Sequence, residues 1–201
     1  IVIEARNLAK RYKCHSSHNQ ALEDYALRIF DVTRRYHGMG KKERLLLQIS
    51  VLLHACGKFI SMKNSNECAY NIIMSTEIIG LSHLEREIVA NVVRYNIRDF
   101  EYDNVHLELG AFQSGLTDVD VKKVTVLIGK LTGILRLANS MDRSHKQKLA
   151  GCRMTMKDRK LVIITDYEGD ITLERVSFEQ KADFFEEIYG IRPILRQKRK
   201  G

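Results

Sequence analysis

The chain has 201 residues, 44% of them hydrophobic, and a formal net charge of +8 at pH 7. This length and apolar content suffice for one large domain, or for one domain with a small appendage. No run approaches the roughly 20 consecutive apolar residues of a membrane-spanning helix, and charged residues within the first dozen positions argue against a signal peptide. We therefore expect a cytoplasmic protein and no membrane partner.

The excess of basic residues favours polyanionic partners, which include nucleic acid, anionic lipid and phosphate chains. The four cysteines form no CxxC pair. Zinc-finger and thioredoxin-like sites are therefore excluded, and free thiols are expected. The sequence begins at Ile1 rather than at a methionine, from which we expect a piece of a longer protein.

Amphipathic periodicity predicts that most of the first part of the chain is helical. The first predicted helix, over 17–36, begins with Ser17 and Gln20 at the spacing of a capping box. The run ERLLLQISVLLHACG follows, and it is apolar on nearly all sides. Such a helix is typically buried at the centre of a domain. A shorter helix is predicted over 68–79.

The next predicted helix, over 82–95, opens with Ser82 and Glu85, again at capping-box spacing. Residues 97–117 contain several turn formers and are predicted to be irregular. A long helix then covers residues 118–143, because apolar side chains recur at helical spacing throughout this segment.

The pattern changes near Gly151. The stretch CRMTMKDRKLVIIT alternates on either side of the dipeptide DR, as a β-hairpin does. An amphipathic helix follows, and IRPIL then indicates a short strand whose proline, Pro193, suits a sheet edge. The sequence therefore predicts a mainly α chain in two parts: an all-helical domain over 1–150 and a small ββαβ subdomain, of α+β type, over 151–201.

Five segments of the chain together resemble one protein family: SSHNQALEDYALRIFD, LLHACGK, IIGLSHLEREIVANVVRYN, LRLANSMDRSH and FEQKADFFEEIYGIRPIL. The chain is similar, over nearly its whole length, to the C-terminal region of exopolyphosphatases and guanosine pentaphosphate phosphatases. The resemblance implies an HD-like helical bundle. It also implies that an actin-like N-terminal pair of domains binds magnesium and cleaves terminal phosphoanhydrides, while the C-terminal region helps to bind polyphosphate and forms dimers.

This chain contains no glycine-rich phosphate loop of the GxGxxG or GxxxxGK[ST] type. The resemblance therefore implies that it is the accessory half of such an enzyme. We expect no cofactor in this fragment, and magnesium only in the actin-like domains.

The resemblance also implies a metal site that has lost its carboxylates. HD hydrolases use about four ligands to lower the pKa of a bound water and to neutralise phosphate charge. His18, His54, Ala55 and Asn139 occupy those positions here. Two imidazoles without a carboxylate suit a hard cation poorly, so we expect a vestigial site with no metal and no catalytic residue. Asp142, one helical turn beyond Asn139, is either a substitute ligand or a hydrogen-bond partner of the interior histidines.

Basic residues near three helix ends are the candidates for binding polyphosphate, because Arg and Lys recognise phosphate through charge-assisted hydrogen bonds. The resemblance implies that these positions meet at one end of the fold. The candidates are Lys58, Arg94, Arg98, Arg143, His145, Lys146 and Lys148. The alternative is structural, since arginines near helix C-termini also stabilise the helix dipole or pair with acids.

Three functions remain open. The first is a non-catalytic domain of an exopolyphosphatase-like hydrolase, which binds the polyanion, forms a homodimer and works with actin-like domains of the same chain. The second is an autonomous metal-dependent HD phosphohydrolase with an altered site. The third is a nucleic-acid-binding module, which we rank last because the chain lacks a helix-turn-helix with a short turn. Polyphosphate and guanosine pentaphosphate both stay open as substrates of the longer protein.

Overall fold

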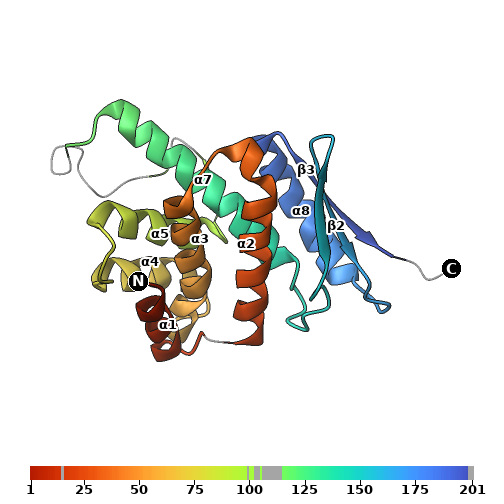
Figure 1. Cartoon of the computed structure of the whole chain (residues 1–201). Coiled ribbons are helices and arrows are strands. Elements are labelled where there is room, and N and C mark those ends of the chain that lie inside the picture. The colour runs from red at the N-terminus through yellow and green to blue at the C-terminus, as the bar shows by residue number, and fades with distance from the viewer. Residues whose placement is uncertain (15, 99, 102–104, 106–114, 199–201) are drawn as a thin grey trace. The chain divides into compact units, whose positions relative to one another are not determined.

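The computed structural model describes the whole chain except residues 15, 99, 102–104, 106–114 and 199–201 (Figure 1). Its described elements are α1 (Val2–Arg11), α2 (Ser17–His37), α3 (Lys41–Leu53), the 3-10 helix η1 (Cys56–Phe59), α4 (Ser65–Ser75), α5 (His83–Tyr95), α7 (Asp118–Ser140), β1 (Arg153–Lys157), β2 (Lys160–Thr165), α8 (Thr172–Tyr189) and β3 (Arg192–Gln197). The predicted mainly α fold with a C-terminal ββαβ arrangement is confirmed. No described helix is both long enough and apolar enough to cross a bilayer.

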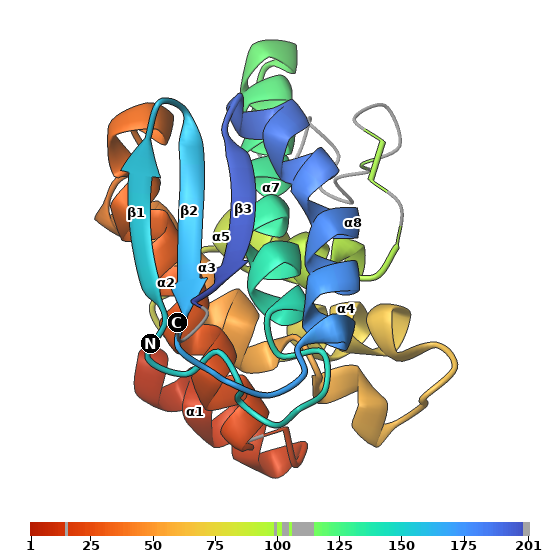
Figure 2. The same ribbon diagram turned by 90° about the vertical axis from the view of Figure 1, so that its right-hand side faces the viewer.

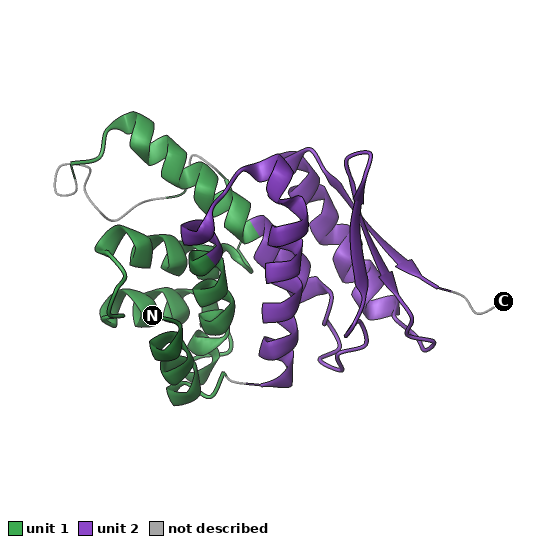
Figure 3. Ribbon diagram, in the orientation of Figure 1, with its two compact units in different colours: residues 1–15, 45–132 green, residues 16–44, 133–201 purple. Residues whose placement is uncertain are grey.

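The chain packs as two compact units (Figure 3). The first unit contains residues 1–15 and 45–132, and the second contains residues 16–44 and 133–201. Helices α3 and α7 each contribute residues to both units. The predicted division at residue 150 stays a prediction, because backbone contacts do not test which segments fold independently.

The first unit is helical, and the later part of α3 is buried within it. Leu46, Leu47, Ile49 and Leu53 are at most 2% exposed. Together with Val51 and Leu52, which are equally buried, they cover all sides of the helix. A buried helix is thereby confirmed for most of the run ERLLLQISVLLHACG, although α3 ends at Leu53 and the last four residues of the run lie outside it. An apolar helix of this kind is stable in water only when neighbouring helices cover it.

Helix α5 begins with the predicted capping box. The backbone N–H of Glu85 donates to Ser82 Oγ at 3.2 Å, and the backbone N–H of Ser82 donates to Glu85 Oε2 at 2.7 Å. These reciprocal hydrogen bonds satisfy donors at the helix start that have no intrahelical partner.

The second unit combines α2 and α8 with a three-stranded sheet of order β1-β2-β3 (Figure 2). Strands β1 and β2 are antiparallel, and the two turn residues between them, Asp158 and Arg159, have left-handed φ values of 49° and 56°. A turn of this hand matches the twist of a hairpin. Strands β2 and β3 are parallel, with Leu161 opposite Pro193 on the edge strand. The predicted hairpin and edge strand are confirmed.

Three predicted helix boundaries in the N-terminal half were wrong. Ser16, not Ser17, is the N-cap of α2, since Ser16 Oγ accepts a hydrogen bond from the backbone N–H of Asn19 at 3.2 Å. Helix α4 covers Ser65–Ser75 rather than residues 68–79. The backbone becomes extended at the next residue, and the chain buries Ile78 outside any helix.

The end of α7 was also predicted wrongly. The helix ends at Ser140 rather than at 143, so Asp142 lies in the turn that follows the helix and not on its inner stripe. The predicted irregular segment 97–117 lies largely outside the described residues. All four cysteines are free thiols, as predicted.

Candidate functional site

The turn after α7, in the second unit, folds around the buried carboxylate of Asp142, which has 0% exposure. Asp142 Oδ2 accepts a hydrogen bond from His18 Nδ1 at 2.7 Å and another from Gln147 Nε2 at 3.1 Å. Asp142 Oδ1 accepts from the backbone N–H of Gln147 at 2.7 Å. Both carboxylate oxygens are therefore engaged. Of the two roles predicted for Asp142, the structure has the hydrogen bond to an interior histidine.

These hydrogen bonds also set the charge of Asp142. Burial by itself raises the pKa of the carboxyl group, because it penalises the charged form. The hydrogen bonds from His18 and Gln147, with the electrostatic effect of the His18 imidazole, outweigh burial and hold the pKa below its ordinary value. The group is therefore an ionised carboxylate at neutral pH, and the Nδ1 atom that faces it carries the proton.

A second buried carboxylate, that of Glu174 in the first turn of α8, holds the same turn from another element of the unit. The backbone N–H of Ser144 donates to Glu174 Oε1 at 3.1 Å, and the hydroxyl of Ser144 donates to the same oxygen. Lys148 Nζ lies 3.8 Å from Glu174 Oε2 and donates to the backbone carbonyl of Asp170 at 2.6 Å. Glu174 itself is 0% exposed.

Residues 141–148, which we call the basic loop, have an uncommon backbone. His145 and Gln147 have left-handed φ values of 57° and 51°, a conformation that costs free energy for residues other than glycine. The ring of His145 stacks on His18, with centroids 3.7 Å apart and planes 3° apart. The two buried carboxylates and this stacking hold the loop in place, and strain maintained in this way is a common feature of functional sites.

The outer side of the basic loop is cationic. Arg143, His145 and Lys146 are exposed, whereas the only acid in the loop, Asp142, is buried. The loop therefore presents basic side chains to solvent without an exposed carboxylate among them. Such a surface suits an anion that accepts several hydrogen bonds at once.

The predicted polyphosphate-binding residues fall into three classes: some are exposed, one is engaged by a backbone carbonyl, and two are paired with an acid. Arg143, Lys146 and His145 are exposed in the second unit, and Lys58 is exposed on η1 in the first. Lys148 is 12% exposed and engaged with Asp170. The predicted convergence of all these positions at one end of the fold stays a prediction.

Arg94 and Arg98, in the first unit, share the carboxylate of Glu67. Arg94 Nη2 lies 3.0 Å from Glu67 Oε2, and Arg98 Nη1 lies 3.2 Å from Glu67 Oε1. The Arg94 guanidinium also lies over the ring of Tyr70, 3.5 Å from its centroid. These contacts are the structural alternative raised by the sequence, and they hold Arg94 at 13% exposure.

The remaining residues of the predicted vestigial metal site are each accounted for locally. His54, in the first unit, donates from Nδ1 to the carbonyl of Val51 at 2.7 Å, and Ala55 precedes η1 as its N-cap. Asn139, in the second unit, lies half-buried in the last turn of α7. Within the described residues, no three His, Cys, Asp or Glu side chains are grouped so as to hold a metal ion.

Sequence reasoning missed Glu174 and Ser144. An acid in the first turn of a helix has an ordinary explanation in the helix dipole, and Ser144 is one of many serines in turns. Only the tertiary fold brings the two together across 30 positions of sequence. The sequence offered one local signal for this turn, which is the acid Asp142 among the basic residues of LRLANSMDRSH, and that signal does not point to Glu174.

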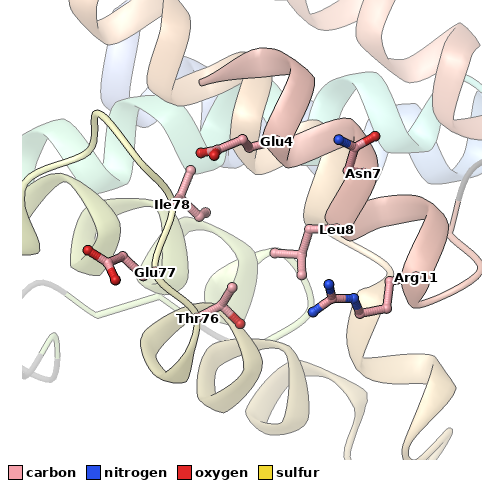
Figure 4. Close-up of a pocket in the computed structure, with 7 residues that line it drawn as sticks. All are labelled: Glu4, Asn7, Leu8, Arg11, Thr76, Glu77 and Ile78. Carbon is pink, nitrogen blue, oxygen red and sulfur yellow. The ribbon is translucent and has the colours of Figure 1, made fainter.

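A separate pocket of about 240 Å³ lies in the first unit, beside α1 (Figure 4). Glu4, Leu8 and Arg11 project from one face of α1 toward residues 76–78. None of the predicted site residues lines this pocket. The Glu4 Oε2 atom has no hydrogen-bond partner in the described part of the chain. Because the atom is also buried, a ligand in the pocket would not reach it. We therefore assign no ligand to this pocket.

Comparison with known proteins identifies the family. The family model described as "Ppx/GppA phosphatase, domain III" matches residues 3–182, which include His18, the basic loop and Glu174. No curated protein matches the chain. The resemblance read from the sequence to exopolyphosphatases and guanosine pentaphosphate phosphatases is thereby confirmed. Since the match extends over most of the chain, the protein belongs to the Ppx/GppA phosphatase family and contains domain III of that family.

Proposed function

We propose that this chain is a non-catalytic, polyanion-binding domain of an exopolyphosphatase-like hydrolase. In this proposal, actin-like domains of the same longer protein bind magnesium and cleave terminal phosphoanhydrides in the cytoplasm. The observation that carries the proposal is the basic loop, in which two buried carboxylates fix the backbone while Arg143, His145 and Lys146 are exposed.

The chemistry of the loop suits a phosphate chain. Every interior phosphoryl unit of such a chain offers two non-bridging oxygens that share one negative charge, and a guanidinium group can donate two parallel hydrogen bonds to them. Lys146 adds a second charge, and the His145 imidazole adds a further hydrogen-bond donor. Because the loop backbone is already held, little conformational entropy is lost when the anion binds.

A metal-dependent HD hydrolase is the second candidate, and one observation favours it: His18 and Asp142 are in contact, as an imidazole and a carboxylate would be around a shared ion. Two features argue against it. Asp142 already accepts three hydrogen bonds and has no exposed surface, and a metal ligand needs a free lone pair directed at an open position. Elemental analysis of the purified chain separates the candidates, since stoichiometric bound metal together with phosphate release would favour the hydrolase.

Binding of inorganic polyphosphate tests the first proposal. The double variant Arg143→Ala/Lys146→Ala should bind at least about fivefold more weakly at low salt. By analogy with single-stranded nucleic acid, the slope of log affinity against log salt should fall in magnitude by roughly 1.5. The matched control is Lys157→Ala/Lys160→Ala, which removes two exposed lysines at the β1–β2 turn of the same unit. Equal losses in both double variants would overturn the assignment to the basic loop.

Dimerisation is part of the proposal as well, carried over from the family. Sedimentation velocity of the chain over a range of concentrations tests it directly. A species of monomer mass at all concentrations would remove dimerisation from the proposed function without affecting the anion-binding part.

A further inference from the structure

A group of large apolar side chains is exposed in the first unit, at the end of η1 and in the turn that leads to α4. Phe59 is 52% exposed, Ile60 is 60% exposed and Met62 is 75% exposed. Tyr12, at the end of α1, meets the Phe59 ring edge-on with centroids 5.7 Å apart. Three exposed apolar residues within four positions are unusual at a protein surface, because single exposed apolar side chains are ordinary but clusters mark interaction sites.

The backbone fixes these side chains in their exposed positions. The N–H groups of Ile60 and Ser61 both donate to the carbonyl of Gly57, at 3.1 and 3.0 Å. A Cβ atom on Gly57 would lie 1.8 Å from the carbonyl oxygen of Ser65, so η1 packs with its backbone directly against the first turn of α4. The segment is therefore a hydrogen-bonded turn that packs against α4 and leaves its apolar side chains exposed.

Three lysines lie close to this group in space or in sequence. Lys13 Nζ lies 6.0 Å from the centroid of the Phe59 ring, and Lys58 and Lys63 flank the apolar residues in sequence. All three lysines are exposed. We call the set the Lys-Phe patch, and its members are Lys13, Lys58, Phe59, Ile60, Met62 and Lys63.

No acid offsets this charge nearby in sequence. The chain has no Asp or Glu over residues 5–22 or 44–66, the two stretches that contain the patch. The next acid, Glu67, is paired with both Arg94 and Arg98. The Lys-Phe patch therefore combines exposed apolar residues with exposed lysines, and no acid lies near them in sequence.

The type of cation indicates the kind of partner. Protein interfaces are enriched in Arg and depleted in Lys, because an ammonium group is strongly hydrated and costly to desolvate. At a lipid headgroup layer a lysine keeps its charged end in water while its aliphatic stem lies along apolar surface. Clusters of Lys beside Phe and Ile are typical of segments that lie on anionic membranes.

We propose that the Lys-Phe patch binds the surface of an anionic lipid bilayer, with Phe59, Ile60 and Met62 inserted among the headgroups. The lysines would contact lipid phosphates around the inserted side chains. This contact is peripheral, so it is compatible with the lack of a spanning segment among the described helices. The sequence-based expectation of no membrane partner rested on the lack of a spanning segment, and the proposal departs from that expectation. The proposal is independent of the basic loop, which belongs to the second unit.

Vesicle binding tests the charge requirement. The 201-residue chain should sediment with phosphatidylcholine vesicles that contain phosphatidylglycerol and stay in solution with pure phosphatidylcholine. Each lysine near an anionic surface strengthens partitioning about fivefold, so Lys58→Gln/Lys63→Gln should weaken it about 25-fold. The control is Lys122→Gln/Lys123→Gln, which removes two exposed lysines of α7 in the same unit.

Insertion must be separated from general adsorption, because a chain of charge +8 is attracted to any anionic surface. The chain contains no tryptophan, so Ile60→Trp introduces a single reporter in the patch. Its emission should shift to the blue on anionic vesicles and be quenched by brominated acyl chains. Ile79→Trp is the matched control, since Ile79 is 70% exposed elsewhere in the unit.

Four outcomes would overturn the proposal: no sedimentation with anionic vesicles, equal binding to neutral vesicles, equal losses in the two double-lysine variants, or equal quenching of the two tryptophans. Circular dichroism of each variant shows that it is folded, which is expected because every substituted side chain is exposed. An acidic protein that binds the chain through Ile60 and Met62, where anionic vesicles do not bind, would assign the patch to a protein partner and would likewise exclude the lipid.

Discussion

His18 Nδ1 and Asp142 Oδ2 are joined by a 2.7 Å hydrogen bond between residues 124 positions apart. The resemblance to HD hydrolases implies a metal ligand at the position of His18. In this chain one nitrogen of that imidazole donates a hydrogen bond to the Asp142 carboxylate of the same unit. The same carboxylate holds the basic loop by accepting hydrogen bonds from Gln147. One buried contact thus connects the predicted vestigial site to the predicted anion-binding residues.

Asp142→Asn should destabilise the protein by about 2–4 kcal/mol at pH 7, because buried donors of His18 and Gln147 lose a charged acceptor. The pKa of Asp142 is lowered in the folded protein. Its contribution is therefore full above the unfolded pKa of about 3.9 and is lost as the pH falls through the folded value. The free energy of unfolding in urea, measured for both proteins from pH 7 to about pH 3, should show a difference that shrinks below about pH 4.

The control for this prediction is Asp166→Asn, since Asp166 is exposed after β2. It should change the free energy of unfolding by less than about 0.5 kcal/mol at any pH. A constant difference between the wild type and Asp142→Asn across the pH range would contradict the assigned ionisation of Asp142.

Local signals in the sequence predicted much of the fold. Three of these signals act within a few residues of the chain and can therefore be predicted from the sequence: the capping pair Ser82 and Glu85, the hairpin turn DR and the edge proline Pro193. The N-cap of α2 was misplaced by one residue because Ser16 and Ser17 are both good caps. Local propensity does not decide between adjacent serines.

Long-range contacts were not predictable in the same way. Lys148 was assigned to polyphosphate from its place after a helix, yet its ammonium group donates to Asp170 and lies near Glu174. Arg94 was assigned similarly, and it is engaged by Glu67 and Tyr70. The sequence gives the charge of a side chain, but whether that charge is already compensated depends on residues far away in the chain.

The two arginines that share Glu67 should differ in their effect on stability. Arg94→Ala should cost about 1–3 kcal/mol, because the side chain is 13% exposed and lies over Tyr70. Arg98→Ala should cost less than about 0.5 kcal/mol, since Arg98 is 58% exposed. Chemical denaturation of the two variants measures both values.

Polyphosphate binding by the same two variants separates structural from binding roles. If the pairing with Glu67 is purely structural, each variant should lose only the small amount of polyphosphate affinity that follows from removing one positive charge anywhere on the chain. A large loss of affinity in Arg98→Ala, at unchanged stability, would instead return Arg98 to the binding site.

Glu174→Ala should weaken polyphosphate binding, although it removes a negative charge. On charge alone the affinity would rise, since the chain becomes more basic. The expected several-fold fall follows from the loss of the acceptor for both donors of Ser144, which releases the basic loop from α8. The matched control is Glu187→Ala, an exposed acid on the same helix, whose affinity should stay the same or rise slightly. An equal rise in both variants would show that Glu174 does not position the loop.

Two glycines provide a test of packing with opposite signs. A Cβ on Gly57 would meet the backbone of Ser65 at 1.8 Å and of Ala69 at 2.5 Å, so Gly57→Ala must separate η1 from α4 and should cost about 3 kcal/mol or more. For Gly133, within α7, the atoms nearest to an added Cβ belong to the rings of Tyr189 and Phe184 and to the tip of Ile188, at 3.5 to 3.9 Å. Gly133→Ala should therefore be neutral or stabilise by up to about 1 kcal/mol, because alanine favours the helix. The urea midpoints of both variants show whether each substitution lowers or raises stability. A destabilised Gly133→Ala would contradict the prediction, because it would mean that the side chains around α7 leave no room for a methyl group.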